Sequence, residues 1–130
     1  MTAPRPAPAS LAITFLQYRD LAAACRFYEE VLGLERVIDQ GWSKIYRLAH
    51  GAHLGLVDEA RGSHRAAATK PVQICLRVPD VAAWHLYAGG RGLAALSPLA
   101  ENRALGIRAF TFEDPEGYQI EIQSPTRPRA

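Results

Sequence analysis

The sequence predicts an α+β domain built from two similar halves, each consisting of a strand, a helix and three further strands. The first observation is an internal repeat, because the segment around Asp20 returns around Asp80. The second is that each Asp follows a short apolar stretch and precedes apolar residues at helical spacing, as a helix cap does. The third is a composition of 48% hydrophobic and 22% charged residues in 130, typical of one globular domain. Two copies indicate a paired domain and not a solenoid.

The first half begins with a predicted strand at residues 11–18, which are apolar with β-branched and aromatic members. Asp20 then caps a helix that Gly33 ends. The apolar positions of this helix fall on one stripe: Leu21, Cys25, Tyr28 and Leu32. Turn residues separate three further strands, expected at residues 34–39, 42–48 and 53–57.

The second half repeats this order of elements. Residues 72–78 predict a strand, Asp80 caps a second helix, and the Gly89-Gly90 pair ends it. Pro115 and Gly117 occupy the second and fourth places of a type I turn. The remaining strands are expected at residues 93–96, 107–112 and 118–123.

These elements divide the chain into five parts. The first unit spans residues 11–57 and the second spans residues 72–124. The polar, Ala-rich residues 58–71 between them are interpreted as a linker. The Pro-rich tails at residues 1–10 and 125–130 are expected to be frayed.

Composition and charge indicate which classes of binding partner are not expected. The net charge is only +2 and the basic residues are scattered, so no nucleic-acid partner is expected. No apolar run approaches the roughly 18 residues of a membrane helix, so no membrane partner is expected. The N-terminal residues lack the apolar centre of a signal peptide, which favours a cytoplasmic location. Cys25 and Cys75 have no metal-type spacing and are expected to be small buried side chains.

Two motifs connect the chain with a known family. The first is Asp20-Leu21 with the run FYEEVLGL at residues 27–34, and the second is DPEGYQIE at residues 114–121. With the repeat they cover about residues 11–124. The arrangement resembles the vicinal oxygen chelate superfamily, which includes glyoxalase I, bleomycin-resistance proteins, fosfomycin-resistance enzymes and extradiol dioxygenases. The resemblance implies two βαβββ units that form a curved, mostly antiparallel open-barrel cup, with one helix packed on each sheet.

The resemblance also locates a metal site. The family often binds a divalent metal inside the cup, with ligands on the first and last strands of each unit. Members of this size commonly form homodimers, so the resemblance also implies a homodimer here. The corresponding positions here hold Ile13, Gly55, Gln73 and Glu121. Isoleucine and glycine have no ligand side chain, so we expect no cofactor at the usual four-ligand site. The alternative is a divalent metal at a reduced or dimer-shared site of Gln73 and Glu121, with His53 as a substitute ligand.

Strand alternation predicts which side chains enter the cup. The expected ligand-binding residues are Phe15, Gln17, His53, Gln73, Arg77 and Gln123. Glu121 is the candidate catalytic residue, as a general base or as an acceptor that orients the ligand. The alternative is that Glu121 forms an inert ion pair with Arg77. Trp42 and Tyr46 are candidates to stack on a flat ligand, with a core or dimer role as the alternative.

These observations predict a glyoxalase- or bleomycin-resistance-like protein that binds a small organic molecule in its cup, without the usual metal site. The first alternative is a metal-dependent lyase, isomerase or dioxygenase with Gln73 and Glu121 at its metal. A metal-free enzyme that uses Glu121 as its base is the second.

Overall fold

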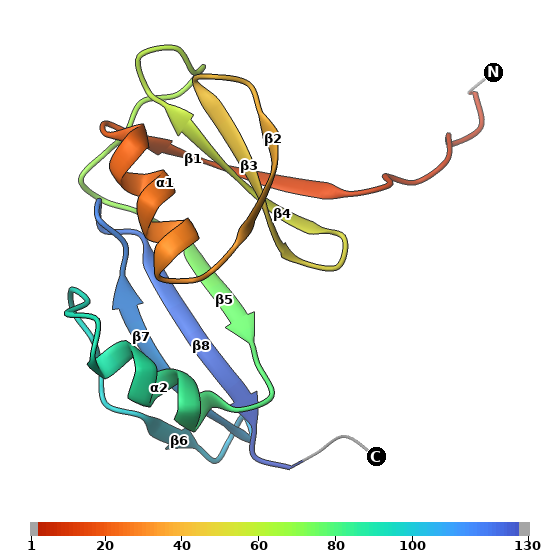
Figure 1. Ribbon diagram of the computed structural model, residues 1–130. Helices are drawn as coiled ribbons and strands as arrows, with labels where there is room; N and C mark the ends of the chain where they lie inside the picture. Colours follow the sequence, from red (N-terminus) through yellow and green to blue (C-terminus); the bar gives the residue numbers. More distant parts are fainter. Residues whose placement is uncertain (1–2, 128–130) are drawn as a thin grey trace.

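A computed structural model describes residues 3–127 and contains two four-stranded sheets and two helices (Figure 1). The first sheet has the order β1-β4-β3-β2, with β1 parallel to β4 and the other pairs antiparallel. Its strands are β1 (Ala12–Tyr18), β2 (Glu35–Asp39), β3 (Ser43–Ala49) and β4 (Ala52–Asp58).

The second sheet repeats this plan in the order β5-β8-β7-β6, again with one parallel pair, β5 with β8. Its strands are β5 (Gln73–Arg77), β6 (Ala100–Asn102), β7 (Ile107–Glu113) and β8 (Gln119–Pro125). Helix α1 (Leu21–Glu30) follows β1, and α2 (Val81–Gly89) follows β5. Two equivalent βαβββ modules confirm the predicted α+β fold class.

The two helices begin in the same way. The Asp20 carboxylate accepts a hydrogen bond from the Ala23 amide at 3.0 Å, and Asp80 accepts one from Ala83 at 3.0 Å. Each aspartate thus satisfies an amide that the helix itself leaves without a partner. Gly33, at φ +67°, follows α1 in the left-handed conformation that glycine adopts without strain.

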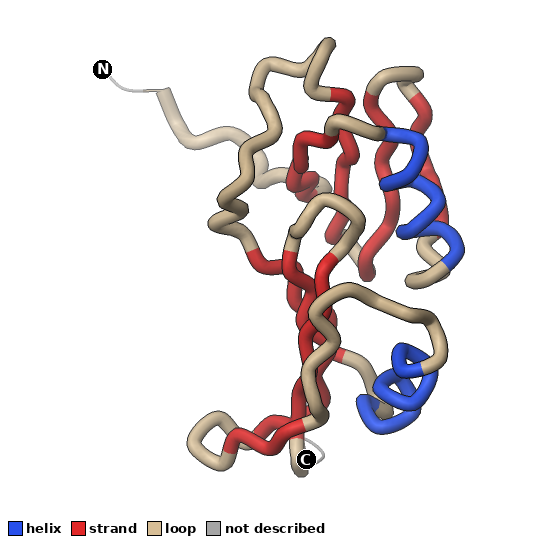
Figure 2. The backbone as a smooth tube through the Cα atoms, turned by 90° about the vertical axis from the view of Figure 1, so that its left-hand side faces the viewer, coloured by secondary structure: helices blue, strands red, loops and turns tan. Residues whose placement is uncertain are grey.

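Both helices lie on the same side of the sheets (Figure 2). The core lies between helices and sheets and includes residues of both modules, among them Leu16, Tyr28, Phe112 and Ile120. We call the opposite side of the two sheets the open face. No strand pairing joins the two sheets within residues 3–127, so the curved sheets do not close into a barrel.

A buried carboxylate connects the two modules. Asp114, in the β7–β8 turn, is 3% exposed. Its Oδ2 accepts hydrogen bonds from the hydroxyls of Tyr18 and Tyr28, and its Oδ1 accepts from the amides of Glu116 and Tyr118. Burial, together with the neighbouring carboxylate, raises the pKa of both Tyr18 and Tyr28 well above the ordinary value. Both hydroxyls therefore remain donors.

Tyr118 also covers the free edge of β1. Its hydroxyl accepts from the Gln17 amide at 3.1 Å and donates to the Gln17 carbonyl at 3.1 Å. Glu116, in the same turn, accepts from the amides of Arg19 and Asp20, each at 2.8 Å. The β7–β8 turn thus binds the main chain where β1 passes into α1.

One predicted strand is wrong. Residues 93–96 form only an isolated bridge from Ala94 to Glu113, and the short strand β6 lies further along the chain. Ala95 has a φ of +53°, which interrupts an extended conformation. The apolar residues that suggested a strand pack on the core from an irregular segment instead: Leu93, Leu96 and Leu99.

The tails differ partly from the prediction. Residues 3–9 have no regular secondary structure and extend away from the sheets (Figure 1). Pro125 belongs to β8, and the Thr126 amide donates to the Gly106 carbonyl at 2.8 Å. The remainder of the predicted tails, residues 1–2 and 128–130, lies outside the described residues. Neither helix of the described chain has the length and apolar character needed to cross a bilayer.

Candidate functional site

A pocket of about 580 Å³ lies on the open face of the first sheet. We call it the first-sheet pocket. Strands β1, β3 and β4 form its floor, the β2–β3 turn forms one side, and the segment after β4 forms another. Its lining residues are Phe15, Gln17, Gln40, Trp42, Ser43, Val57, Arg61, Gly62, Ser63 and His64. The volume is in the range of small-molecule sites.

Phe15 and Trp42 supply aromatic surface to this pocket, and both are partly exposed, at 49% and 40%. The Phe15 ring lies across Gly55 on the neighbouring strand, since a Cβ at Gly55 would be 2.4 Å from Phe15 Cδ1. Only glycine leaves room for the ring in this position. Trp42 lies in the turn before β3, whereas Tyr46 is fully buried and donates to Glu29 at 3.2 Å. Trp42 therefore lines the pocket, and Tyr46 belongs to the core.

Two buried polar atoms at the pocket have no hydrogen-bond partner among the described residues: Gln17 Oε1 and Ser43 Oγ. Gln17 is 8% exposed and Ser43 is 2% exposed. A buried polar atom without a partner costs about 1–3 kcal/mol. Such atoms are rare in folded proteins and are usually satisfied by water or by a ligand.

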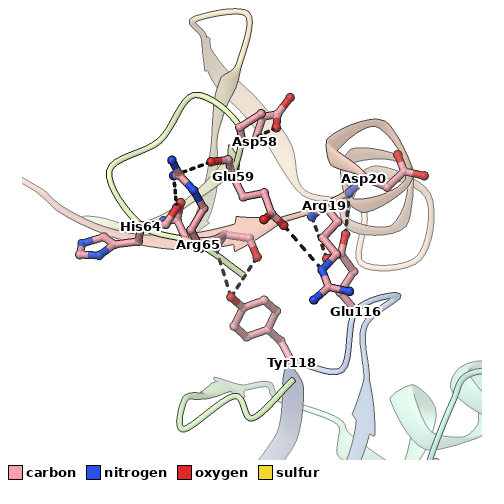
Figure 3. Close-up of polar contacts among 10 residues, drawn as sticks. Arg19, Asp20, Asp58, Glu59, His64, Arg65, Glu116 and Tyr118 are labelled. Atoms are coloured by element: carbon pink, nitrogen blue, oxygen red, sulfur yellow. Dashed lines mark hydrogen bonds and ion pairs between the residues drawn. The ribbon is translucent and has the colours of Figure 1, made fainter. Parts of the chain in front are cut away.

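The segment at residues 58–65, which we call the wall segment, has a defined shape (Figure 3). Arg65 Nη1 lies 2.8, 2.9 and 3.2 Å from the carbonyl oxygens of Glu59, Gly62 and His64. The Glu59 carboxylate lies 3.6 Å from Arg19 Nε at the end of β1.

Gly62 brings the wall segment onto the sheet. A Cβ at this position would be 2.6 Å from Val57 Cγ1 and 2.8 Å from Gln17 Oε1. The backbone therefore approaches the floor so closely that any other residue would require the Val57 or Gln17 side chain to shift. The Gln17 and Val57 side chains are buried beneath it.

The predicted residues of the second module lie on the open face of the second sheet. Gln123 Oε1 accepts from Arg77 Nε at 3.0 Å and from Nη2 at 2.6 Å, while Gln123 Nε2 donates to Glu121 at 2.6 Å. The Gln123 side-chain amide thus bridges Arg77 and Glu121. The direct ion pair between these two residues, considered from the sequence, is wrong. Gln73 donates to Gln119 at 2.6 Å.

The cysteines differ from each other. Cys25 is buried on α1, as expected, whereas Cys75 is exposed on β5, so the expectation of burial is wrong for Cys75. Cys75 Sγ lies 3.9 Å from Glu121 Oε1. Partial burial and the neighbouring carboxylate raise the pKa of the Cys75 thiol, and Arg77 partly opposes this effect.

The predicted site residues are therefore divided between two places. Phe15 and Gln17 lie together in the first-sheet pocket. His53 is on the same sheet, paired in register with Ile13 and Arg47, and its Nδ1 is buried without a partner in the described chain. It does not line the pocket. Four predicted residues lie on the second sheet: Gln73, Arg77, Glu121 and Gln123.

The sequence interpretation missed the wall segment. Residues 58–71 appeared as a linker because they are polar and contain few large apolar residues. Ser43, Arg61 and His64 line the pocket because distant parts of the chain pack together. No local pattern marked them, although the glycine at position 62 indicated a place where the backbone could approach another element.

A family model for the Glyoxalase/Bleomycin resistance protein/Dioxygenase superfamily matches residues 10–122. The chain belongs to this superfamily. Solved structures agree: TioX from Micromonospora sp. ML1 has 18% identity and a TM-score of 0.73, with 90% of this chain and 99% of that chain covered. Lactoylglutathione lyase from Agrobacterium tumefaciens has 22% identity and a TM-score of 0.71, covering 90% and 94%. Comparison with curated protein sequences gives no match.

A glyoxalase/bleomycin resistance protein from Catenulispora Acidiphila is also similar, with 23% identity, a TM-score of 0.66, and coverage of 89% of this chain and 98% of that chain. At these identities the likeness establishes the glyoxalase-like fold alone. The fold does not determine the chemistry of this superfamily member, because one fold supports many reactions.

The superfamily's metal positions do not suit a metal in this chain. Ile13 has no donor atom, and the Phe15 ring covers Gly55. Gln73 and Glu121 are hydrogen-bonded to neighbouring amides, as described above. Within residues 3–127, no three His, Cys, Asp or Glu side chains are grouped so that they could hold a metal ion. One carboxylate and one amide do not form the ligand set that a hard divalent cation requires.

Proposed function

We propose that this glyoxalase-like protein binds a small organic molecule in the first-sheet pocket. The observation that carries the proposal is the pair of buried polar atoms without partners, Gln17 Oε1 and Ser43 Oγ, in a pocket with aromatic surface. Apolar surface with a few convergent polar groups is the usual composition of a ligand site. A ligand that hydrogen-bonds to these atoms recovers the cost of their burial.

This proposal moves the site within the fold. Glu121, the candidate from the sequence, lies in the second module, where it lines a more open hollow of about 630 Å³, whereas the pocket with unsatisfied polar atoms lies in the first. The superfamily offers both ligand-binding and catalytic members, and the metal positions of this chain favour binding without the usual metal. The homodimer and the cytoplasmic location stay predictions.

Two buried serines allow a matched test. Ser43 Oγ has no partner in the described chain, whereas Ser124 Oγ donates to the Val78 carbonyl at 2.6 Å and accepts from the Val81 amide at 3.0 Å. Ser124→Ala should therefore lower the melting temperature of the free protein. Ser43→Ala should not, because it removes a polar atom that has no hydrogen bond to lose.

A thermal-shift screen of planar aromatics, thiol adducts and peptide antibiotics then tests binding, because a ligand of the native state raises the melting temperature. We expect at least one compound to stabilise the wild type, with the shift reduced in Ser43→Ala and Trp42→Ala and retained in Ser124→Ala. The proposal fails if no compound stabilises the protein. It also fails if every stabilising compound acts equally on Ser43→Ala and Trp42→Ala.

A further inference from the structure

The charges around the first-sheet pocket are one-sided. Among residues 3–127, Arg61 is the one Lys or Arg that lines the pocket, and no Asp or Glu lines it. Arg61 forms no ion pair within residues 3–127. Neighbouring arginines differ in this respect: Arg19, Arg36 and Arg47 contact carboxylates, and Arg65 contacts main-chain carbonyls.

The position of Arg61 follows from the shape of the wall segment. The amides of Arg61 and Gly62 both donate to the Asp58 carbonyl at 3.0 Å, which forms a tight turn directly after β4. Arg65 fixes the other end of the segment. The turn thus places Arg61 in the lining of the pocket, next to Gly62, and its guanidinium has no ion pair within residues 3–127. An unpaired guanidinium prefers a planar anion, which it can bind through two parallel hydrogen bonds.

The aromatic side chains define a second requirement. The Phe15 ring lies over Gly55, and Trp42 is partly exposed in the turn before β3. Flat aromatic surfaces favour planar ligands through stacking and edge-to-face contacts. The third requirement comes from Gln17 and Ser43, which line the pocket and whose Oε1 and Oγ atoms are buried without a hydrogen-bond partner in the described chain.

We infer that the first-sheet pocket selects a planar aromatic acid. Its ring contacts Phe15 and Trp42, its anionic group faces Arg61, and a polar substituent bonds Gln17 or Ser43. The inference rests on the proposed function and narrows it to one ligand class. A ligand of the same shape with an ammonium group is disfavoured, because it brings a second positive charge to a pocket without a lining carboxylate.

Three ligands that share one ring system separate charge from shape: 1-naphthoate, 1-naphthalenemethanol and 1-naphthylmethylamine. Isothermal titration of the full chain at low salt gives their dissociation constants. Because Arg61 is exposed, its effect is moderate, and we expect naphthoate to bind about tenfold more tightly than the amine. The alcohol should fall between them, and added salt should reduce the difference.

Arg61→Gln tests the residue itself, and Arg91→Gln is the matched control. Arg91 lies over the Tyr87 ring in the second module, 5.8 Å from the ring centroid, and is remote from the pocket lining. The acid-to-amine preference should disappear in Arg61→Gln and persist in Arg91→Gln. A preference unchanged in Arg61→Gln, or an amine that binds the wild type as tightly as the acid, overturns the inference.

The screen described above distinguishes the two failures. If other compounds bind in a way that depends on Ser43 and Trp42 while naphthoate does not, the ligand class is wrong and the proposed function stands. If neither the screen nor the naphthalene series gives any binding, the proposed function fails and the ligand class fails with it.

Discussion

Replacing Asp114 by alanine should lower the free energy of unfolding by about 4 kcal/mol. The carboxylate accepts four hydrogen bonds, two from tyrosine hydroxyls and two from main-chain amides. Tyr18 and Tyr28 are fully buried. Each loses its carboxylate acceptor in the variant, at a cost of about 1–3 kcal/mol. Their mutual contact at 3.2 Å satisfies only one of the two hydroxyls as a donor.

Two milder variants grade the effect. Asp114→Asn retains an oxygen for the amides of Glu116 and Tyr118 but places an NH₂ group against the tyrosines, so we expect about half the loss. Tyr28→Phe removes a single bond and should cost about 1–2 kcal/mol. Tyr87→Phe is the control, because the Tyr87 hydroxyl donates to Val31 from an exposed position and should cost about 0.5 kcal/mol or less.

Urea denaturation followed by fluorescence and circular dichroism measures these differences. Since Asp114 joins residues of both modules, its loss should also separate the transitions seen by the two methods. A loss for Asp114→Ala no greater than that for Tyr87→Phe would refute the reasoning. So would an order in which Tyr28→Phe is more destabilising than Asp114→Ala.

Three further predictions concern titration and packing. The pKa of Tyr28 in the folded protein is raised above the ordinary value of 10.0, so its contribution to stability is complete below about pH 10 and is lost as the pH rises above that. The free energy of unfolding should therefore fall at alkaline pH, and less steeply in Tyr28→Phe. Iodoacetamide should modify Cys75 slowly near pH 8. Glu121→Gln removes a charge that raises the thiol pKa and should therefore accelerate the reaction. An unchanged rate, measured by mass spectrometry, would contradict the contact between Cys75 and Glu121. Gly55→Ala should destabilise the protein by about 1–2 kcal/mol, because the new methyl group displaces the Phe15 ring. In a Phe15→Ala background the same change should be neutral or stabilising. Urea titration measures both, and equal effects in the two backgrounds would exclude this coupling.

Local chemistry explains what the sequence could predict. Asp20 and Asp80 each cap a helix with their own neighbours, so the repeat locates both helices without knowledge of the rest of the fold. The side chains of β5 alternate as a strand requires: Arg77 is exposed on the open face, as predicted, and Ile74, on the opposite face, is buried in the core. The prediction of a strand at residues 93–96 is wrong, because an apolar run is equally compatible with a strand and with a loop packed on the core.

The site depended on contacts between distant residues. Gly55 appeared in the sequence as a lost metal ligand, and the structure gives it a different role as the place on which Phe15 lies. Gln123 separates Arg77 from Glu121, because parallel pairing of β5 with β8 places Gln123 directly opposite Arg77. Gly62 and Arg61 enter the pocket only when the wall segment folds back onto the sheet. Such contacts leave no periodicity that a sequence pattern could reveal.

The clamp formed by Arg65 separates the shape of the wall segment from its chemistry. Its Nη1 donates to main-chain carbonyl oxygens of the wall segment, which every amino acid possesses. Substitutions at Arg61, Ser63 or His64 therefore leave these hydrogen bonds available while changing the side chains that line the pocket. The backbone course of the wall segment therefore does not depend on which side chains occupy the positions that line the pocket. Arg65 thus maintains the backbone of the wall segment, and the side chains that line the pocket can change independently of it.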